Sequence, residues 1–336
     1  MNRYAITVLV ASAAAVLLPV PPSAAADGLP VPVDGVNEGS GVASSDGAFR
    51  YVATTAGTAT LVQRISVWGG VVLDERELSG TLGVPRVALD GTASGVSFDG
   101  SRLVLIRPRT TFPRESTELR VLRVGERGFH SRPQRLVLDG DFSFDALSPD
   151  GETAYLVEYP NRRDPQDYQV RALDLATGKL DPKPILDTEE EPGEMRGYPM
   201  TRATAPDGTW EYTLYDGGGG EPFIHALDVE HGRTVCIDLP QLDASAAYRA
   251  GLAFGDDSLL TVSTEASRRH PAEDVAVVDT GDFSVGAPAA SAGSSTTDEG
   301  GWPLLWPAGL AAVTLALLAA LAFRRRRGAP PELAAG

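Results

Sequence analysis

The sequence predicts an all-β fold, a β-propeller of five four-stranded blades, followed by one C-terminal transmembrane helix. Five similar stretches recur at nearly constant spacing. Each has an Asp-Gly pair between two β-rich runs, which is typical of a hairpin. An uncharged apolar stretch at 303–323 is long enough to cross a bilayer.

The recurring unit is about 50 residues long. The five copies are "GVASSDGAFRYVA", "SGVSFDGSRLVLI", "DALSPDGETAYLV", "RATAPDGTWEYTL" and "GLAFGDDSLLTVS". Their turn aspartates are Asp46, Asp99, Asp150, Asp207 and Asp256, spaced 53, 51, 57 and 49 residues apart. Four-stranded units at this period are typical of a propeller, in which no blade is stable alone. Six blades are the alternative if residues 28–36 open an extra or shared one.

Each unit contains four predicted strands in the same order. The third copy begins with "ALSPDGETAYLVEY", a small apolar run, an Asp-Gly turn and a β-rich run. A polar loop, the run "YQVRALDL", the tight turn "ATGK" and a last short run follow. The near-continuously apolar "RLVLI" predicts burial on both faces. In the fifth copy Asp257 replaces the glycine, so we expect a less regular turn, and either "LPVPV" or "FSV" would close the ring.

The first 26 residues have the layout of a secretory signal peptide. Arg3 precedes an apolar run from Tyr4 to Leu18, and small residues end the segment at Ala26. Prolines at 19, 21 and 22 make a retained anchor the weaker alternative, because they shorten the apolar run. We therefore expect a propeller at 27–286 and a flexible linker at 287–302, which is rich in Ala, Gly, Ser and Thr.

The C-terminal region predicts a single membrane span at 303–323. Trp302 and Trp306 mark one interface, and Arg324 to Arg327 follow the span directly. Aromatic residues at one end and arginines at the other agree with the positive-inside rule. The expected location is the cell membrane, with the propeller outside and the tail 324–336 in the cytoplasm.

The predicted exported part is strongly acidic. Residues 27–302 hold 24 Lys and Arg against 44 Asp and Glu, a net charge of −20. This sign disfavours nucleic acid as a partner. Cys236 is the one cysteine, so no intrachain disulfide can form, and a buried strand position is its expected role.

The third unit carries a family resemblance. "LSPDGETAYLVEY" followed by "VRALDLATGKL" resembles the blades of YVTN-type, TolB-like and WD-repeat-like bacterial propellers, with their PDG turn, hydrophobic strand and "iDlatGk" hairpin. The match is good over residues 142–180 and fair over 200–230. The resemblance implies the fold and leaves the function open, because such blades serve binding, scaffolding and several enzyme chemistries.

Polar loops between the second and third strands form the first candidate site. Strand alternation puts these loops on one face of the ring and the Asp-Gly turns on the other. The loops carry Arg107, Arg109, Arg114, Arg162, Arg163, Arg268 and Arg269. Guanidinium groups suit carboxylates and phosphates, so these arginines could receive an anionic ligand. The alternative, which we favour, is neutralisation by acidic residues nearby.

The innermost strands give a second candidate. Asp145 and Arg202 each stand five residues before a turn aspartate, so they occupy equivalent places in adjacent blades. They could hold a ligand at the channel mouth. A structural ion pair is the alternative reading and the preferred one.

The sequence shows no catalytic motif, and no cofactor or metal is expected. The four histidines are scattered, and "DGDFSFDALSPD" has Phe144 where a calcium loop needs glycine. The expected function is a membrane-tethered binding or scaffold module for an envelope protein or an anionic ligand. The alternative is a propeller enzyme of lactonase, lyase or glycosidase type.

Overall fold

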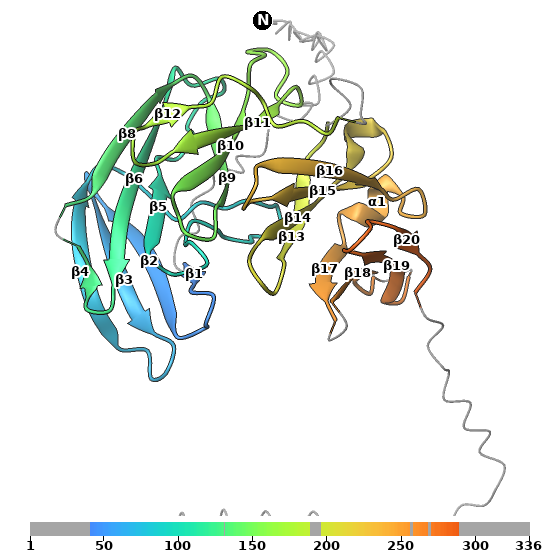
Figure 1. Ribbon diagram of the computed structural model, residues 1–336, viewed down its shortest axis with the longest axis horizontal. Coiled ribbons are helices and arrows are strands. Elements are labelled where there is room, and N and C mark those ends of the chain that lie inside the picture. The colour runs from blue at the N-terminus through green and yellow to red at the C-terminus, as the bar shows by residue number, and fades with distance from the viewer. Residues whose placement is uncertain (1–40, 131, 189–195, 256–257, 268–269, 289–336) are drawn as a thin grey trace, which may run out of the picture. The chain divides into compact units, whose positions relative to one another are not determined.

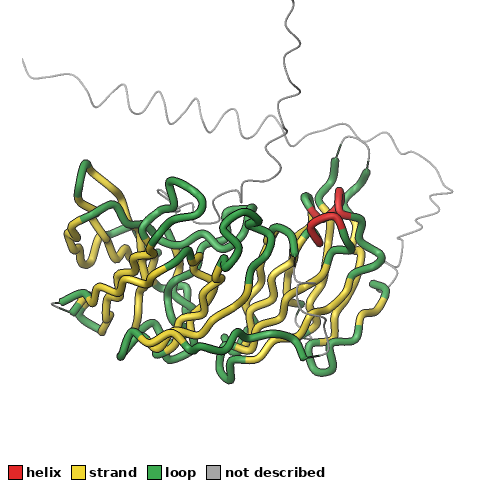
Figure 2. Tube along the Cα trace, turned by 90° about the horizontal axis from the view of Figure 1, so that it is seen from above, coloured by secondary structure: helices red, strands yellow, loops and turns green. Residues whose placement is uncertain are grey.

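The computed structural model describes residues 41–130, 132–188, 196–255, 258–267 and 270–288. These residues are almost entirely strand, turn and loop (Figure 2), with helix limited to α1 (Ala244–Ala247) and the 3-10 turn η1 (Gly217–Gly219). The predicted signal peptide, the span at 303–323 and the tail lie outside them. No helix among the described residues is long and apolar enough to cross a membrane.

The strands form five antiparallel sheets of four strands, as predicted. Figure 1 shows the sheets following one another in chain order. The first contains β1 (Val42–Ala43), β2 (Phe49–Ala56), β3 (Ala59–Ser66) and β4 (Val72–Ser79). The second contains β5 (Arg102–Ile106), β6 (Ser116–Gly125), β7 (Gly128–Phe129) and β8 (Gln134–Asp139). The third contains β9 (Phe142–Leu147), β10 (Thr153–Glu158), β11 (Gln169–Asp174) and β12 (Lys179–Leu180).

The last two sheets repeat this arrangement. The fourth contains β13 (Pro199–Thr204), β14 (Trp210–Tyr215), β15 (Phe223–Asp228) and β16 (Arg233–Asp238). The fifth contains β17 (Ala250–Phe254), β18 (Leu259–Thr264), β19 (Glu273–Asp279) and β20 (Val285–Gly286). Five such sheets, each packed on the next, are the arrangement of a β-propeller.

The Asp-Gly turns have one design in the first three sheets. The hydroxyl of the serine two residues earlier donates to the turn aspartate at 2.6 Å in each, and the aspartate also accepts from the backbone N–H two residues later. The following glycines, Gly47, Gly100 and Gly151, have φ between +67° and +70°, which glycine adopts without steric cost. The recurring sequence therefore encodes its turn through local hydrogen bonds.

The fifth turn differs from the turns of the first three sheets. Ser258 stands in the left-handed conformation with φ 64°, and its N–H donates to the carbonyl of Gly255. The turn spans one residue fewer, because Gly255 N–H pairs with Leu259 O, where Ser148 N–H in the third sheet pairs with Thr153 O. Asp256 and Asp257 lie outside the described residues.

Burial on both faces is visible in β5. Leu103 and Leu105 pack into a cluster with the first sheet, whereas Val104 and Ile106 pack into a cluster with the third. All four side chains are fully buried, and each contributes about 1.5–3 kcal/mol. This explains why the strand reads as a continuous apolar run.

The second sheet lacks a regular innermost strand. Gly95 has φ +112°, and a Cβ there would lie 2.7 Å from the carbonyl oxygen of Val104. The chain approaches β5 too closely at this point for any other residue, and only an isolated bridge joins Val96 to Leu103. The sheet reaches four strands because β7 and β8 both pair with β6.

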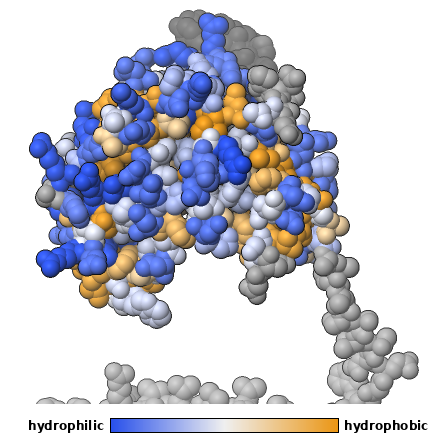
Figure 3. Space-filling model, viewed as in Figure 1, coloured by the Kyte–Doolittle hydropathy of each residue, from blue (hydrophilic) through white to orange (hydrophobic). Residues whose placement is uncertain are grey.

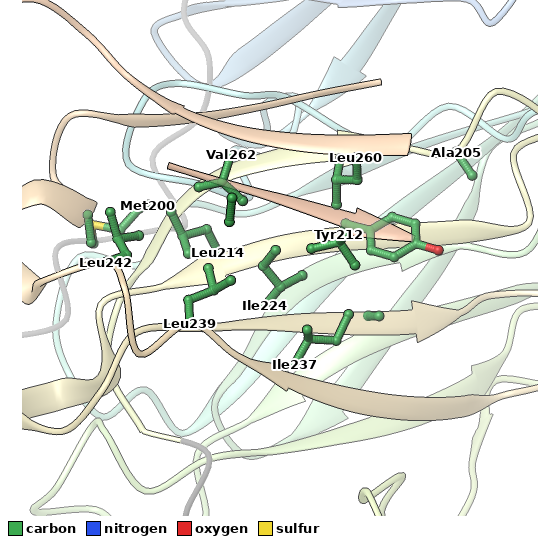
Figure 4. Close-up of a cluster of buried hydrophobic side chains, with 14 residues drawn as sticks. Met200, Ala205, Tyr212, Leu214, Ile224, Ile237, Leu239, Leu242, Leu260 and Val262 are labelled. Atoms are coloured by element: carbon green, nitrogen blue, oxygen red, sulfur yellow. The ribbon is translucent and has the colours of Figure 1, made fainter. Parts of the chain in front are cut away.

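Four interfaces join neighbouring sheets. Figure 4 shows the largest cluster, in which Tyr212, Leu214 and Ile224 of the fourth sheet pack against Leu260 and Val262 of the fifth. Similar clusters join the first sheet to the second, the second to the third and the third to the fourth. Among the described residues no cluster or strand pairing joins the fifth sheet to the first.

Neither predicted closing segment makes that contact among the described residues. Phe283 of "FSV" instead packs on Trp210 of the fourth sheet, with ring centroids 5.2 Å apart. Val285 begins β20 of the fifth sheet. "LPVPV" at 29–33 lies outside the described part of the chain.

Candidate functional site

The sheets have two chemically different ends. We call the end with the Asp-Gly turns the turn end, and the end with the long loops between second and third strands the loop end. Hydrogen bonds and packing connect the turn end across sheets: the Ser45 hydroxyl donates to the Phe98 carbonyl, and the Phe98 ring packs directly on Gly208. The loop end carries most of the arginines predicted as a ligand site.

Arg107 at the loop end is bound by Glu118. Its Nη2 and Nε atoms lie 2.7 and 3.2 Å from Glu118 Oε2. Arg135 bonds the same carboxylate at 3.1 Å, and Arg120 pairs with it as well. Burial raises the pKa of Glu118, but the hydrogen bonds from Arg135 and Arg107 and the charge of Arg120 outweigh it and lower the pKa to about 2. One buried carboxylate therefore holds three guanidinium groups.

Arg109 and Arg114 are bound by Asp141. The Nε and Nη2 atoms of Arg109 lie 2.9 and 2.5 Å from Asp141 Oδ1. The backbone N–H of Arg114 donates to Oδ2 at 2.9 Å, and its Nε lies 3.2 Å from Oδ1. Only 3% of the Arg109 side chain and 2% of the Asp141 side chain are exposed. The guanidinium also lies over the Tyr159 ring, 4.7 Å from its centroid.

Of the remaining loop arginines, the structure describes Arg162 and Arg163. Arg162 pairs with Glu115 at 2.5 Å on the surface, which lowers the pKa of Glu115 through the hydrogen bond. Arg163 is exposed, and Arg268 and Arg269 lie outside the described residues. Ligand binding by the loop arginines stays a prediction. The geometry of Arg107, Arg109, Arg114 and Arg162 supports the alternative of neutralisation by carboxylates.

Asp145 and Arg202 meet, as their equivalent positions in β9 and β13 suggested. Arg202 Nη2 pairs with Asp145 Oδ1, and Nη1 donates to the Asp145 carbonyl at 2.6 Å. Its Nε donates to Thr213 Oγ1 at 2.8 Å. Each side chain is only 4% exposed. The pair lies between two sheets with its hydrogen bonds satisfied, and this geometry favours the structural reading over a ligand-holding one.

Two further ionisable side chains of the fourth sheet lie near this pair. His225 on β15 is 1% exposed, and burial lowers its pKa to about 4, so the ring is neutral at pH 7. Glu211 on β14 accepts from the Thr204 hydroxyl at 2.8 Å. It lines a cavity of about 310 Å³ together with residues 42–45, residues 93–98, Leu147 and residues 204–208. Burial raises the pKa of Glu211 to about 7 despite this opening.

Glu211 makes a testable contribution to pH dependence. Its folded pKa of about 7 lies above its ordinary value of 4.5, so the folded state holds the proton more tightly and loses stability as pH rises through this range. We expect Glu211→Gln to equal the wild type near pH 4.5 and to exceed it at pH 8 by about 1–2 kcal/mol, discounted for the partial exposure of the carboxyl. Urea unfolding at both pH values measures the difference.

The comparison of wild type with Glu211→Gln also controls for the titration of His225. His225 changes stability in the opposite direction between its folded pKa of about 4 and its ordinary 6.5, but it does so equally in both proteins. The difference between wild type and Glu211→Gln therefore isolates Glu211. A difference that does not change with pH would contradict the raised pKa.

The turn end carries a basic cavity that the sequence analysis missed. Its volume is about 430 Å³, and it lies between the second and third sheets. Arg102 of β5, Arg123 of β6, His130 and Arg132 line one side, and the turn residue Glu152 lines the other. Among the described residues no carboxylate lies within ion-pair distance of the three guanidinium groups.

Two arginines of this cavity are direct cross-strand partners. Arg102 pairs with Arg123 in the β5–β6 register, so both side chains project from the same face. Like charges in this position destabilise a sheet unless an anion lies between them. Gly151 opposite, with φ +67°, leaves room for the Arg102 side chain, because a Cβ there would lie 2.5 Å from Arg102 Cγ. The cavity combines unpaired positive charge with space for a ligand.

The fold and these sites define the chain as an all-β protein of the propeller class. No known protein family matches the sequence, and no curated protein is similar to it. Solved structures of similar fold include hydrazine synthase from Kuenenia stuttgartiensis, at 16% identity and a TM-score of 0.44, covering 73% of this chain and 64% of that one. TolB from Acinetobacter baumannii matches at 13% identity and a TM-score of 0.41, covering 74% and 53%.

A functionally unknown protein from Desulfotomaculum acetoxidans is similar at the same level. It is 13% identical with a TM-score of 0.44, and the match covers 73% of this chain and 67% of that one. The chain spans less than two thirds of the length of the hydrazine synthase and TolB chains. At these identities and TM-scores the likeness says nothing about what this protein binds or does.

Proposed function

We propose that this protein is a membrane-tethered, extracytoplasmic propeller that binds an anionic ligand in the basic cavity at its turn end. The observation that carries the proposal is the cross-strand pair Arg102 and Arg123, which lines a cavity of about 430 Å³ with Arg132 and His130. Guanidinium groups recognise carboxylates and phosphates through paired hydrogen bonds. The ligand class is therefore a phosphate or a carboxylate.

The contrast with the loop end supports this assignment. There, Arg107, Arg109, Arg114 and Arg162 already have carboxylate partners in Glu118, Asp141 and Glu115. An added anion would have to displace a partner that is covalently part of the protein. At the turn end no carboxylate forms an ion pair with the arginines among the described residues, although Glu152 lines the cavity and the charge of Arg102 also acts on the carboxyl of Asp150. Residues 27–302 carry a net charge of −20 and therefore repel anions. Binding an anion to this domain thus requires a local group of positive side chains.

The described sites support binding more than catalysis. Four buried ionisable groups, Asp141, Asp145, Arg109 and Arg202, form two ion pairs, so their charges are already neutralised within the protein. Membrane tethering and the outside location are part of the proposal and rest on residues 1–26 and 303–327, as argued above. The function is thus recognition of an anionic group at the cell surface.

Charge reversal in the cavity tests the proposal. We expect Arg123→Glu to weaken binding of inorganic phosphate or citrate to the full chain in detergent by about tenfold or more, because a hydrogen bond to a charged group contributes about 1.5–3 kcal/mol. Arg50→Glu is the matched control: Arg50 is an exposed arginine on β2 that does not line the cavity. Isothermal titration calorimetry at fixed ionic strength measures the affinities.

Two results would count against the site. Equal weakening by Arg123→Glu and Arg50→Glu would show that only the overall charge of the domain matters. If neither phosphate nor citrate binds saturably to the wild type, the proposed ligand class is wrong. Retained binding in Arg50→Glu with loss in Arg123→Glu assigns the site to the cavity.

A further inference from the structure

The β3–β4 hairpin exposes an unusual run of apolar side chains. Val67, Trp68, Val71 and Leu73 are 51%, 84%, 56% and 52% exposed. Figure 3 shows apolar surface at the lower left of the view, where Figure 1 places this hairpin. Contiguous apolar surface of this kind on an acidic, water-exposed domain marks a contact site.

The hairpin has a defined conformation. The N–H of Ser66 donates to the Val71 carbonyl at 2.9 Å, and the N–H of Gly70 donates to the Ser66 carbonyl at 3.1 Å. Gly69 and Gly70 stand at φ +83° and +66°, which only glycine adopts easily. The apolar side chains are therefore presented on a rigid support, and none of them belongs to a buried cluster of the fold.

The hairpin lies at the turn end, and the described chain also leaves the fifth sheet there. Val67 N–H donates to the Ala48 carbonyl, one residue after the first Asp-Gly turn. At the fourth Asp-Gly turn, Trp210 packs on Phe283 of the β19–β20 turn. β20 begins two residues after Phe283, and the described residues end at Pro288.

We infer that the Val67–Leu73 hairpin inserts its apolar side chains into the interfacial layer of the lipid bilayer. The inference rests on the membrane tether of the proposed function. Fourteen residues separate Pro288 from the predicted span at 303–323, with a mean reach of roughly 19–22 Å for a flexible chain. The tether therefore starts at the end of the propeller that carries the hairpin.

The chemistry of the hairpin fits a bilayer surface. Residues 65–73 contain no acidic side chain, and tryptophan with aliphatic neighbours suits the boundary between headgroups and acyl chains. The basic cavity opens at the same end, between the turn residues Gly151 and Glu152 and the arginines of β5 and β6. Its positive charge offsets the repulsion between lipid phosphates and an otherwise acidic domain.

A fluorescent label on the hairpin tests this contact. The full chain, with Cys236→Ser and a single new cysteine, is labelled with an environment-sensitive dye and reconstituted in phosphatidylcholine and phosphatidylglycerol vesicles. A label on Val71→Cys should be quenched several-fold more by lipids carrying doxyl groups on their acyl chains than a label on Arg163→Cys, an exposed position at the loop end. Adding Trp68→Ser and Leu73→Ser should remove most of that difference.

The outcomes separate this inference from the tether. Flotation of the vesicles after carbonate extraction reports the tether independently of the label. If the chain stays with the vesicles but the Val71→Cys label is no more quenched than the Arg163→Cys label, the hairpin contact is wrong and the tether stands. This outcome includes the case in which a second protein, and not lipid, covers the hairpin. Loss of the chain in carbonate would overturn the tether and this inference with it.

Discussion

Asp141→Ala should lower the free energy of unfolding by about 3–5 kcal/mol, because it leaves the buried Arg109 guanidinium without its carboxylate. The Arg109 side chain is 3% exposed, so water cannot replace the lost partner. Arg114 loses its backbone and side-chain contacts to the same carboxylate. Urea unfolding of a secreted fragment ending at Pro288 measures the loss.

Glu115→Ala provides the matched control for Asp141→Ala. Glu115 also binds a loop arginine, Arg162, but both side chains are largely exposed, at 83% and 57%. Its loss should leave the free energy of unfolding nearly unchanged, because water replaces an exposed partner and screens the pair. Similar losses in the two variants would mean that the Arg109–Asp141 pair is not buried as described, and would leave the loop arginines available to a ligand.

Arg202→Met should also cost about 3–5 kcal/mol, since it leaves the Asp145 carboxylate buried between two sheets with no counter-ion. The change also removes the donors to the Asp145 carbonyl and to Thr213. The double variant Asp145→Val with Arg202→Met should recover most of this loss, because an apolar pair of similar volume avoids burying an unpaired charge. Unfolding by urea of all three variants completes a double-mutant cycle.

The cycle distinguishes the two readings of this pair. A structural ion pair predicts a strong interaction energy between the two positions and unchanged phosphate binding in the double variant. If the pair held a ligand, the double variant would lose binding without large changes in stability. A double variant as unstable as Arg202→Met would contradict the structural reading.

The binding surface that we propose lies at the opposite end from the one that composition suggested. The loop end attracts attention because its loops are long and rich in arginine, and function commonly lies in such loops. Its described arginines, however, are mostly bound by Glu118, Asp141 and Glu115. The turn end has short, regular turns, yet it carries both the unpaired Arg102 and Arg123 and the exposed hairpin.

The repeat and its turns were predictable because their causes are local. In the first three sheets the turn is held by hydrogen bonds from a serine to an aspartate two residues later and from backbone N–H groups close by in the chain. Burial on both faces could likewise be predicted from "RLVLI", because alternate side chains of a strand point to opposite faces and so pack against different neighbouring sheets. The close approach of the chain to β5 at Gly95 was not predictable, because it depends on contacts with Val104 and Pro85, which are distant in sequence or set by the tertiary fold.

The class of fold, the number of recurring units and the meeting of Asp145 with Arg202 at equivalent blade positions thus follow from the sequence alone. The pairing of the other arginines depends on the tertiary structure. Arg109 pairs with Asp141, which lies in the connection between the second and third sheets. Arg102 is opposite Arg123 because of the β5–β6 register, which the loop between these strands does not determine. Turns and strand faces follow from neighbours in the chain, whereas the pairing of charges follows from contacts between distant segments, which no local pattern encodes.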